Sequence, residues 1–304
     1  MSSISRTYAR GMEIHQLRYV ELVAREASFT AAARRARVSQ SALSTQIAKL
    51  ERELGHRLFD RGRHGAIPTA AGERLISRSR DALRALDGIS ETAHELSGQL
   101  IGTVRIGAVV GCEMPWLSTG IAGFVARHPG VALSYGEGAS DGLLEGLRAG
   151  RLDLALVGHA GPFPADLTGT LLVDGPLVVL RPDSPDQEGL RGEPVRPADL
   201  KDARVITLPP GTGARAALDR TTRAAGIPLR PTFEANSGAM VIDLVRKGAG
   251  TGILAAGMVE PPPEGITVSP LSGSASSSLS LAHRPTPSTA TSGLLEMLLD
   301  ALGT

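Results

Sequence analysis

Short polar side chains between Gln40 and Lys49 are the first residues whose types and spacing could do chemistry. They follow the turn Arg37-Val38-Ser39, in which Ser39 is a candidate N-cap for a helix. One side of that helix would expose Gln40, Ser41, Ser44, Thr45 and Lys49. Polar groups on the N-terminal half of a helix can enter the major groove and hydrogen-bond base edges. The pattern predicts a DNA-reading helix.

Two preceding helices must position this reading helix. Apolar residues from Leu17 to Ala24 predict one amphipathic helix, and Ser28 is a cap candidate for a short Ala-rich helix from Phe29 to Ala36. The small side chains of Ala32 and Ala33 would let that helix cross the reading helix closely. Three helices with a tight second turn form a helix-turn-helix.

A hairpin and a long helix follow. Leu58 to Pro68 is typical of a hairpin with a Gly- and Arg-rich tip, which would bring cations to a backbone phosphate. Thr69 can cap a helix that extends to about Ser97. Apolar residues recur every seven positions along it, at Leu75, Ala82, Ile89 and Leu96, and Leu86 and Ala93 flank this stripe. This stripe predicts a helix-pairing seam, and packing against the chain's own body is the alternative.

The charge distribution supports a polyanion partner for the first part of the chain. Of the 32 basic and 31 acidic residues, 12 and 6 lie in residues 1–69, a local balance of +6 that leaves −5 for the remainder. A basic segment joined to a mildly acidic body is typical of a nucleic-acid-binding module with a second domain. A solvated, charged helix face is the alternative explanation.

From Thr103 onward, strands alternate with helices, which predicts an α/β body. The expected strands are Thr103–Val109, Val131–Tyr135, Leu152–Val157, Leu177–Leu180, Arg204–Leu208, Pro231–Glu234, Gly252–Ala255 and Ser278–Ala282. The expected helices are Pro115–His128, Ser140–Ala149, Gly213–Ala225, Ser237–Lys247 and Ser288–Leu302.

The sequence from Met12 onward resembles that of the LysR-type transcriptional regulators. The matching segments of the N-terminal part are Met12-Glu13-Ile14-His15-Gln16-Leu17, Phe29-Thr30-Ala31-Ala32-Ala33, Val38-Ser39-Gln40, Leu58-Phe59-Asp60-Arg61 and Thr69-Ala70-Ala71-Gly72. Further on, they are His128-Pro129-Gly130-Val131, Gly150-Arg151-Leu152-Asp153-Leu154-Ala155, Leu244-Val245, Gly248, Gly250 and Gly252. The resemblance covers essentially Met12 to the C-terminus.

The resemblance implies a domain plan. Residues 1–11 would be a disordered extension, 12–69 a winged helix-turn-helix DNA-binding domain (helix-turn-helix at about 29–48), and 70–98 a linker and dimerisation helix. Residues 99–304 would form two Rossmann-like subdomains of the type 2 periplasmic-binding-protein arrangement, crossed near Asp174–Leu180 and Leu279–Arg284. Lobe I would hold about 99–173 and 284–304, and lobe II about 174–283.

The resemblance also implies roles for residues of the DNA-binding domain. The base-edge candidates are Gln40, Ser41, Ser44 and Thr45, and the phosphate candidates are Thr30, Arg34, Lys49, Arg61 and Arg63. Family members usually carry Pro where Ser41 stands, Arg where Thr45 stands and Leu where Ala36 stands. The base-reading set is therefore shorter and less charged than usual, which affects the operator sequence but not the mode of binding. For Arg34 a solvated helix face is the alternative.

A small-molecule effector is expected between the two lobes, where ligands lie beyond strand ends and against helix N-termini. The matching positions are Val110, Gly111, Cys112, Ser140, Gly158, His159, Pro210, Gly211, Thr212 and Gly213. The resemblance implies an effector such as an organic acid. Gly111 and Gly158 stand where members often place hydroxyls or an Arg, so an aromatic or dicarboxylic acid fits this chain less well. His159 could contact the effector or only end a strand.

Redox, metal-dependent and enzymatic functions find little support in the sequence. Cys112 is the single cysteine, so an internal disulfide is excluded, and a small buried apolar role is more common for such a residue than thiol sensing. The chain has no P-loop ending, GxSxG elbow or metal-ligand spacing, so no cofactor or metal is expected.

The expected protein is a cytoplasmic regulator without a membrane segment or export signal. It would bind double-stranded operator DNA as a homodimer or homotetramer, and contact RNA polymerase if it activates. A stand-alone solute-binding protein and a two-lobed enzyme are the alternatives.

Overall fold

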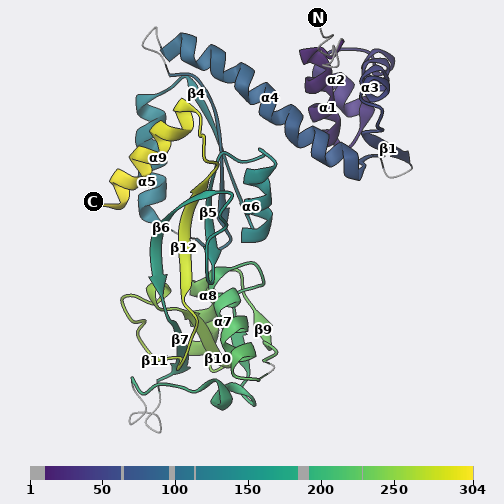
Figure 1. The fold of residues 1–304 in the computed structure, drawn as a ribbon. Coiled ribbons are helices and arrows are strands. Elements are labelled where there is room, and N and C mark those ends of the chain that lie inside the picture. Colours follow the sequence, from purple (N-terminus) through teal and green to yellow (C-terminus); the bar gives the residue numbers. More distant parts are fainter. Residues whose placement is uncertain are drawn as a thin grey trace, which may run out of the picture. The chain divides into compact units, whose positions relative to one another are not determined.

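Two units, Met1–Gly98 and Gln99–Thr304, each enclose a hydrophobic core of their own. The computed structural model describes residues 11–62, 65–95, 100–112, 114–183, 192–227 and 229–303 (Figure 1). Within these residues, no helix combines the length and the apolar composition needed to cross a membrane.

Unit 1 is a three-helix domain followed by a hairpin and a long helix. Its elements are α1 Ile14–Glu26, α2 Phe29–Ala36, α3 Gln40–Leu54, β1 Phe59–Gly62, β2 Gly65–Pro68 and α4 Ala70–Glu95. The predicted caps are confirmed: the Oγ atoms of Ser28 and Ser39 accept hydrogen bonds from Ala31 N and Ala42 N. Gly55 ends α3 with a φ of 71°, a left-handed conformation that glycine adopts easily.

The core of unit 1 explains the close crossing of α2 and α3. Ala32 and Ala33 are buried, and Leu43, Ile47 and Leu50 of α3 are buried against the same cluster. The hairpin is tied to α3 by Glu51, whose Oε1 accepts hydrogen bonds from the backbone amides of the first hairpin residues. These contacts hold the exposed side of α3 in a defined place.

Gly72 lets the hairpin approach α4. A Cβ atom on Gly72 would lie 2.0 Å from the carbonyl oxygen of Leu58, which no side chain can tolerate. Thr69 caps α4 by accepting from Gly72 N at 2.9 Å and donates to Arg57 O at 2.7 Å. The Thr69-to-Gly72 segment therefore forms a structural joint between the hairpin and the long helix.

Lobe I of unit 2 is a five-stranded sheet with helices on both faces (Figure 1). In spatial order its strands are β4 Val131–Gly138, β3 Gly102–Val109, β5 Leu154–His159, β12 Ser277–His283 and β6 Thr168–Gly175. Leu154 and Leu156 pack with α5 Pro115–Arg127 and α9 Thr289–Leu302, whereas Ala155 and Val157 pack with α6 Ser140–Arg148. The period of two along β5 thus divides the core into two layers.

Lobe II repeats the plan with a second five-stranded sheet. In spatial order its strands are β11 Ile266–Pro270, β7 Leu177–Pro182, β10 Thr251–Ala255, β8 Val205–Thr207 and β9 Phe233–Glu234. Its helical segments are α7 Gly213–Ala224, α8 Gly238–Arg246, η2 Pro197–Leu200 and η3 Ala256–Met258. The parallel β10–β8–β9 part follows the predicted alternation of strands and helices.

The structure corrects the second crossing between the lobes. Ser277–His283 pairs antiparallel with both β5 and β6, so the whole of β12 belongs to lobe I. The chain therefore returns to lobe I before Ser277, and not near Leu279–Arg284, and lobe II does not extend to residue 283. The first crossing, between Gly175 and Leu177, lies where we expected it.

Two strands escaped the sequence analysis, β6 and β11. Both are edge strands without a continuous apolar run, because β6 is mostly exposed and β11 contains the buried polar residues Thr267 and Ser269. In β6, Leu171 is 59% exposed, and β11 ends at Pro270. The predicted fold class, an all-α winged helix-turn-helix followed by two α/β lobes, is confirmed.

Candidate nucleic-acid interface and ligand cavity

The predicted reading face lies along the first two turns of α3. Gln40, Ser41 and Thr45 are exposed and Ser44 is half-buried, while the opposite side of the helix packs into the core of unit 1. Thr30, in the first turn of α2, is exposed as well. The structure therefore brings the four base-edge candidates onto one accessible helix face.

These four side chains are not equally available. Thr45 Oγ1 donates to the carbonyl of Ser41 at 2.8 Å, and the hydroxyls of Ser41 and Ser39 are 3.1 Å apart. The Gln40 amide makes no hydrogen bond within the described part of the chain. An amide offers both a donor and an acceptor to a base edge, so Gln40 is the strongest base-reading candidate.

The phosphate candidates also differ. Lys49 Nζ lies 3.6 Å from a Glu13 carboxylate oxygen and 3.9 Å from one of Glu53, so its charge is already partly compensated. Arg34 is exposed and forms no ion pair with another described residue. Of the hairpin candidates, Arg61 is described by its backbone in β1 only, and Arg63 lies outside the described residues.

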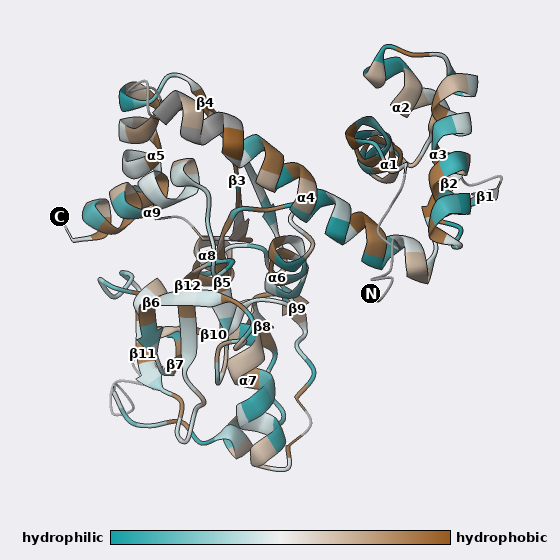
Figure 2. Cartoon of the chain, turned by 45° about the horizontal axis from the view of Figure 1, so that its top comes forward, coloured by the Kyte–Doolittle hydropathy of each residue, from teal (hydrophilic) through white to brown (hydrophobic). Residues whose placement is uncertain are grey.

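Helix α4 carries two apolar faces, and hydrophobic residues recur along its length (Figure 2). Ile76 and Leu83 are buried in the core of unit 1, and Leu75 of the predicted stripe also packs partly against that core. The rest of the described stripe faces away: Ala82 is exposed, Leu86 is half-buried and Ile89 is 68% exposed. Leu96 lies outside the described residues. Leu75 therefore packs against the chain's own core, and pairing of the exposed face beyond it with a second helix stays a prediction.

In unit 2, the predicted effector positions lie where the lobes meet. A Cβ atom on Gly111 would lie 2.6 Å from the carbonyl oxygen of Asn236. One on Gly158 would lie 2.6 Å from the amide nitrogen of Gly213. Real Cβ atoms do not approach that closely, so these glycines allow backbone to pack on backbone between the lobes.

Ser140 takes part in the same lobe contact. Its amide donates to Gly211 O of lobe II at 2.8 Å, and its Oγ accepts from Gly158 N at 3.0 Å. Gly211 has a φ of 86°, and a Cβ there would lie 2.5 Å from that of Ala139. The buried Ser140 hydroxyl thus joins α6 to β5 within lobe I, while the Ser140 amide bonds to lobe II.

The remaining predicted positions surround this contact. Thr212 caps α7 by accepting from Arg215 N and donates to Pro209 O at 2.9 Å, while Pro210 is exposed. His159 is half-buried, with Nε2 3.0 Å from Ser280 Oγ and Nδ1 3.0 Å from Gly161 O. Both imidazole nitrogens are therefore engaged within lobe I, as expected for a residue that ends a strand.

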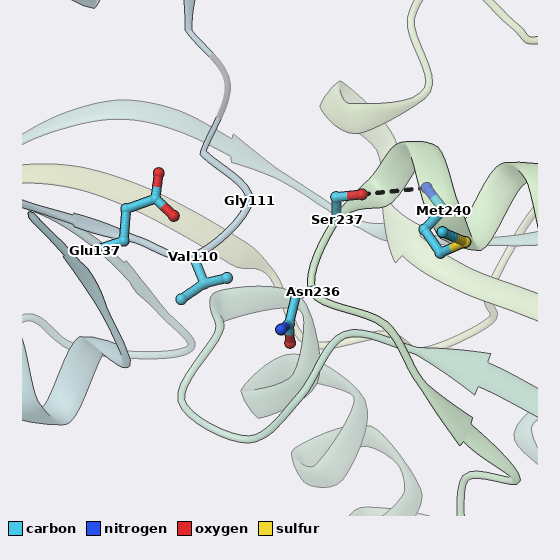
Figure 3. A pocket seen from close by; sticks show the side chains of 6 residues that line it. All are labelled: Val110, Gly111, Glu137, Asn236, Ser237 and Met240. Carbon is cyan, nitrogen blue, oxygen red and sulfur yellow. Dashed lines mark hydrogen bonds between the residues drawn. The ribbon is translucent and has the colours of Figure 1, made fainter.

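A cavity of about 400 Å³ lies beside this contact, bounded by residues of both lobes (Figure 3). Its lining residues are Val110, Gly111, Glu137, Asn236, Ser237 and Met240. Val110 and Gly111 were predicted, whereas the other four were missed. Asn236 and Ser237 immediately precede α8, so the rule that ligands lie against helix N-termini could have found them.

The cavity is electrostatically negative on its lobe I side. Glu137 is its charged lining residue, and the Tyr135 hydroxyl donates to Glu137 Oε1 at 3.2 Å. Burial, and then the Glu137 carboxylate, raise the pKa of Cys112 to about 11, and the same two causes raise the pKa of Tyr135 to about 12. The Cys112 thiol is thus protonated at neutral pH, which argues against thiol sensing.

The Arg151-Leu152-Asp153 segment, prominent in the resemblance, has a structural role. Asp153 is buried, and its carboxylate accepts from the backbone amide of Arg105 at 2.9 Å and from the Arg284 guanidinium at 3.2 Å. This pair joins the start of β5 to the end of β12. Within the described residues, no group of three His, Cys, Asp or Glu side chains is placed to hold a metal ion.

Two family descriptions match the chain. Residues 14–73 match "Bacterial regulatory helix-turn-helix protein, lysR family" and residues 97–303 match "LysR substrate binding domain". The RuBisCO operon transcriptional regulator of Acidithiobacillus ferrooxidans is 31% identical over 252 residues, 82% of this chain and 80% of that protein. The HTH-type transcriptional regulator CysB of Haemophilus influenzae is 30% identical over 246 residues, 80% of this chain and 76% of that protein.

Solved structures share the architecture. Full-length OxyR C199D from Pseudomonas aeruginosa matches with a TM-score of 0.72 and 28% identity, over 97% of this chain and 95% of that one. Full-length CbnR complexed with its target DNA matches in fold, with a TM-score of 0.56 and 21% identity over 95% and 100% of the two chains. The relatives are regulators and not enzymes or stand-alone solute-binding proteins. The chain belongs to the LysR family of DNA-binding transcriptional regulators, with an N-terminal helix-turn-helix and a C-terminal effector-binding domain.

Proposed function

We propose that this regulator reads its operator through α3, with Gln40 as the main base-edge contact and Ser41, Ser44 and Thr45 beside it. The observation that carries this proposal is the exposed polar face of α3, on which the Gln40 amide has no hydrogen-bond partner within the described residues. Thr30 and Arg34 would contact the phosphate backbone, together with Arg61 and Arg63 of the hairpin. Lys49 contributes less because two carboxylates already compensate its charge.

A gel-shift titration against the DNA beside the protein's own gene tests this proposal. Gln40→Ala should weaken specific binding about 10- to 100-fold and relax the preference at one base-pair position, because a bidentate contact is worth roughly 1–3 kcal/mol. Ser118→Ala, at an exposed polar position of α5 in the other unit, is the matched control and should change nothing. Equal affinity of the wild type for operator and random duplex at all salt concentrations would refute the proposal.

The proposed effector site is the cavity between the lobes. Its lining offers one carboxylate, one amide, one hydroxyl and a thioether, with no basic side chain. The N-terminus of α8 would favour an anion, but an organic acid would also meet the Glu137 carboxylate without a basic side chain to compensate it, so we favour a neutral or cationic molecule with hydrogen-bond donors. Thermal unfolding with amines, amides and carboxylic acids of one carbon skeleton tests this: selective stabilisation by the carboxylic acids would contradict it.

The exposed face of α4 supports a homodimer, which could assemble further into a homotetramer through the effector-binding domains. Ile89 is the most exposed large apolar side chain on this face, and burying it against a second copy would remove it from water. Ile89→Glu should therefore shift the protein toward monomer in analytical ultracentrifugation, whereas Asp87→Ser, at a neighbouring exposed position, should not. Wild-type protein that sediments as a monomer at micromolar concentration would refute the dimer.

In this scheme, effector binding between the lobes would alter how the paired subunits hold operator DNA in the cytoplasm. If the protein activates transcription, RNA polymerase would be a further partner. In vitro transcription from the operator-linked promoter, with and without the effector found in the unfolding assay, separates activation from repression.

A further inference from the structure

Arg37 occupies a backbone conformation that arginine rarely adopts. It ends α2 with φ 56° and ψ 40°, and its backbone N–H is directed to the carbonyls of Ala33 and Arg34. Among the described residues, Ala27 is the other non-glycine residue with a positive φ. A side chain is strained in this region, where glycine is comfortable, and such strain tends to be found at functional sites.

The side chain of Arg37 is free for a partner. Arg37 is exposed, and its guanidinium makes no hydrogen bond or ion pair with another described residue. Arg34 is equally unpaired among the described residues, whereas Arg35 lies 3.6 Å from a Glu26 oxygen and Lys49 lies near Glu13 and Glu53. Arg37 thus keeps its full charge for an external anion.

Arg37 lies close to the reading face along the chain. It lies two residues before the N-cap Ser39 and three before Gln40, in the turn that leads into α3. A phosphate beside the base pairs read by the first turn of α3 would therefore be near the Arg37 backbone. Guanidinium groups bind phosphate oxygens with two parallel hydrogen bonds, and such contacts fix the register of a helix in its groove.

We propose that Arg37 is a DNA-positioning residue that contacts a backbone phosphate at the entrance to the reading helix. This inference rests on the proposed DNA-reading mode of α3. The arginine costs the free protein backbone strain that a glycine would avoid, and the phosphate contact compensates for that strain only in the DNA complex. Stability and DNA affinity should consequently respond to substitution in opposite directions.

Arg37→Gly tests the proposal by thermal unfolding and by DNA binding at several salt concentrations. The variant should unfold about 2–6 °C higher, because the strain is relieved. It should bind operator and random duplexes about tenfold more weakly, with the slope of log K against log salt reduced by about one per bound subunit. Arg37→Lys, which keeps the charge, should retain the salt slope.

Ala27→Gly is the matched control, because it relieves the same kind of strain in the same unit without changing charge. It should raise the unfolding temperature and leave DNA binding unchanged. An unchanged salt slope in Arg37→Gly, or an equal loss of affinity in Ala27→Gly, would overturn the role of Arg37. A wild type without sequence preference would instead refute the proposed reading mode, so the two failures are distinguishable.

Discussion

The reading face of α3 and the contact between the lobes of unit 2 place their predicted functional residues in opposite circumstances. On α3, the polar side chains remain accessible, and the Gln40 amide stays uncommitted within the described part of the chain. Between the lobes, Gly111, Ser140 and Gly158 support backbone packing, and the cavity lies beside them. A local motif thus places an exposed helix face reliably, whereas a site between distant segments depends on how those segments pack.

The largest expected effect comes from the joint below the reading face. Gly72→Ala would place a Cβ 2.0 Å from a backbone carbonyl oxygen, so we expect a loss of about 3 kcal/mol or more in the stability of unit 1. Gly88→Ala in the same helix meets nothing within 4 Å and should gain up to about 1 kcal/mol from helix propensity.

Two probes separate the units in this experiment. Trp116, the single tryptophan, lies on α5 of unit 2, so its fluorescence reports that unit alone, and far-ultraviolet circular dichroism reports the helices of both. Gly72→Ala should lower the midpoint temperature of the dichroism transition and leave that of the Trp116 fluorescence unchanged. Unaltered melting of both signals would show that the hairpin does not need this close approach to α4.

The next largest loss of stability is expected at the contact between the lobes. Gly158→Ala would bring a Cβ within 2.6 Å of Gly213 N, and separating the lobes to accommodate it should cost about 1–3 kcal/mol. Gly136→Ala on β4 meets nothing within 4 Å and is the matched control. Trp116 fluorescence should report earlier unfolding for Gly158→Ala only. If both variants melt like the wild type, the lobes do not need this contact.

The smallest effect concerns the charge of the cavity. At pH 8, alkylation of Cys112 should be about 100-fold slower than that of an ordinary thiol, because a pKa of about 11 leaves little thiolate. Glu137→Gln should speed this reaction several-fold but not fully, since burial is the larger cause of the shift. Glu296→Gln, at an exposed position of α9, is the control. Equal rates in wild type and Glu137→Gln would remove Glu137 from the electrostatics of the site.

The raised pKa of Cys112 makes the stability of the folded protein depend on pH in the alkaline range. The folded state holds the Cys112 proton more tightly than the unfolded state, whose thiol has a pKa near 9.0. The stabilisation is therefore fully present below pH 9 and is lost as the pH rises towards 11. Cys112→Ala should remove this part of the alkaline loss in a urea titration of the Trp116 signal.

The sequence predicted the helices well because their signals are local. Ser28, Ser39 and Thr69 cap the helices they were expected to cap, and Gly55 ends α3. The strands of low apolar content were harder. The edge strand β6 was missed. The point at which the chain returns to lobe I was also misplaced, because the serine-rich start of β12 is held in the sheet by its pairing with β5 and β6 and its composition does not indicate a strand.

The sequence by itself determined the helix-turn-helix, its exposed polar face, the α/β body and the family, since capping residues and hydrophobic periodicity act over a few residues. Only the tertiary structure decided that Gly158 and Ser140 hold the lobes together, that Glu137 and Asn236 bound the cavity, and that Arg37 carries an uncompensated charge beside the reading helix. The physical reason is that close approach, burial and charge compensation depend on segments about 20 to 130 residues apart in the chain, which no local pattern specifies.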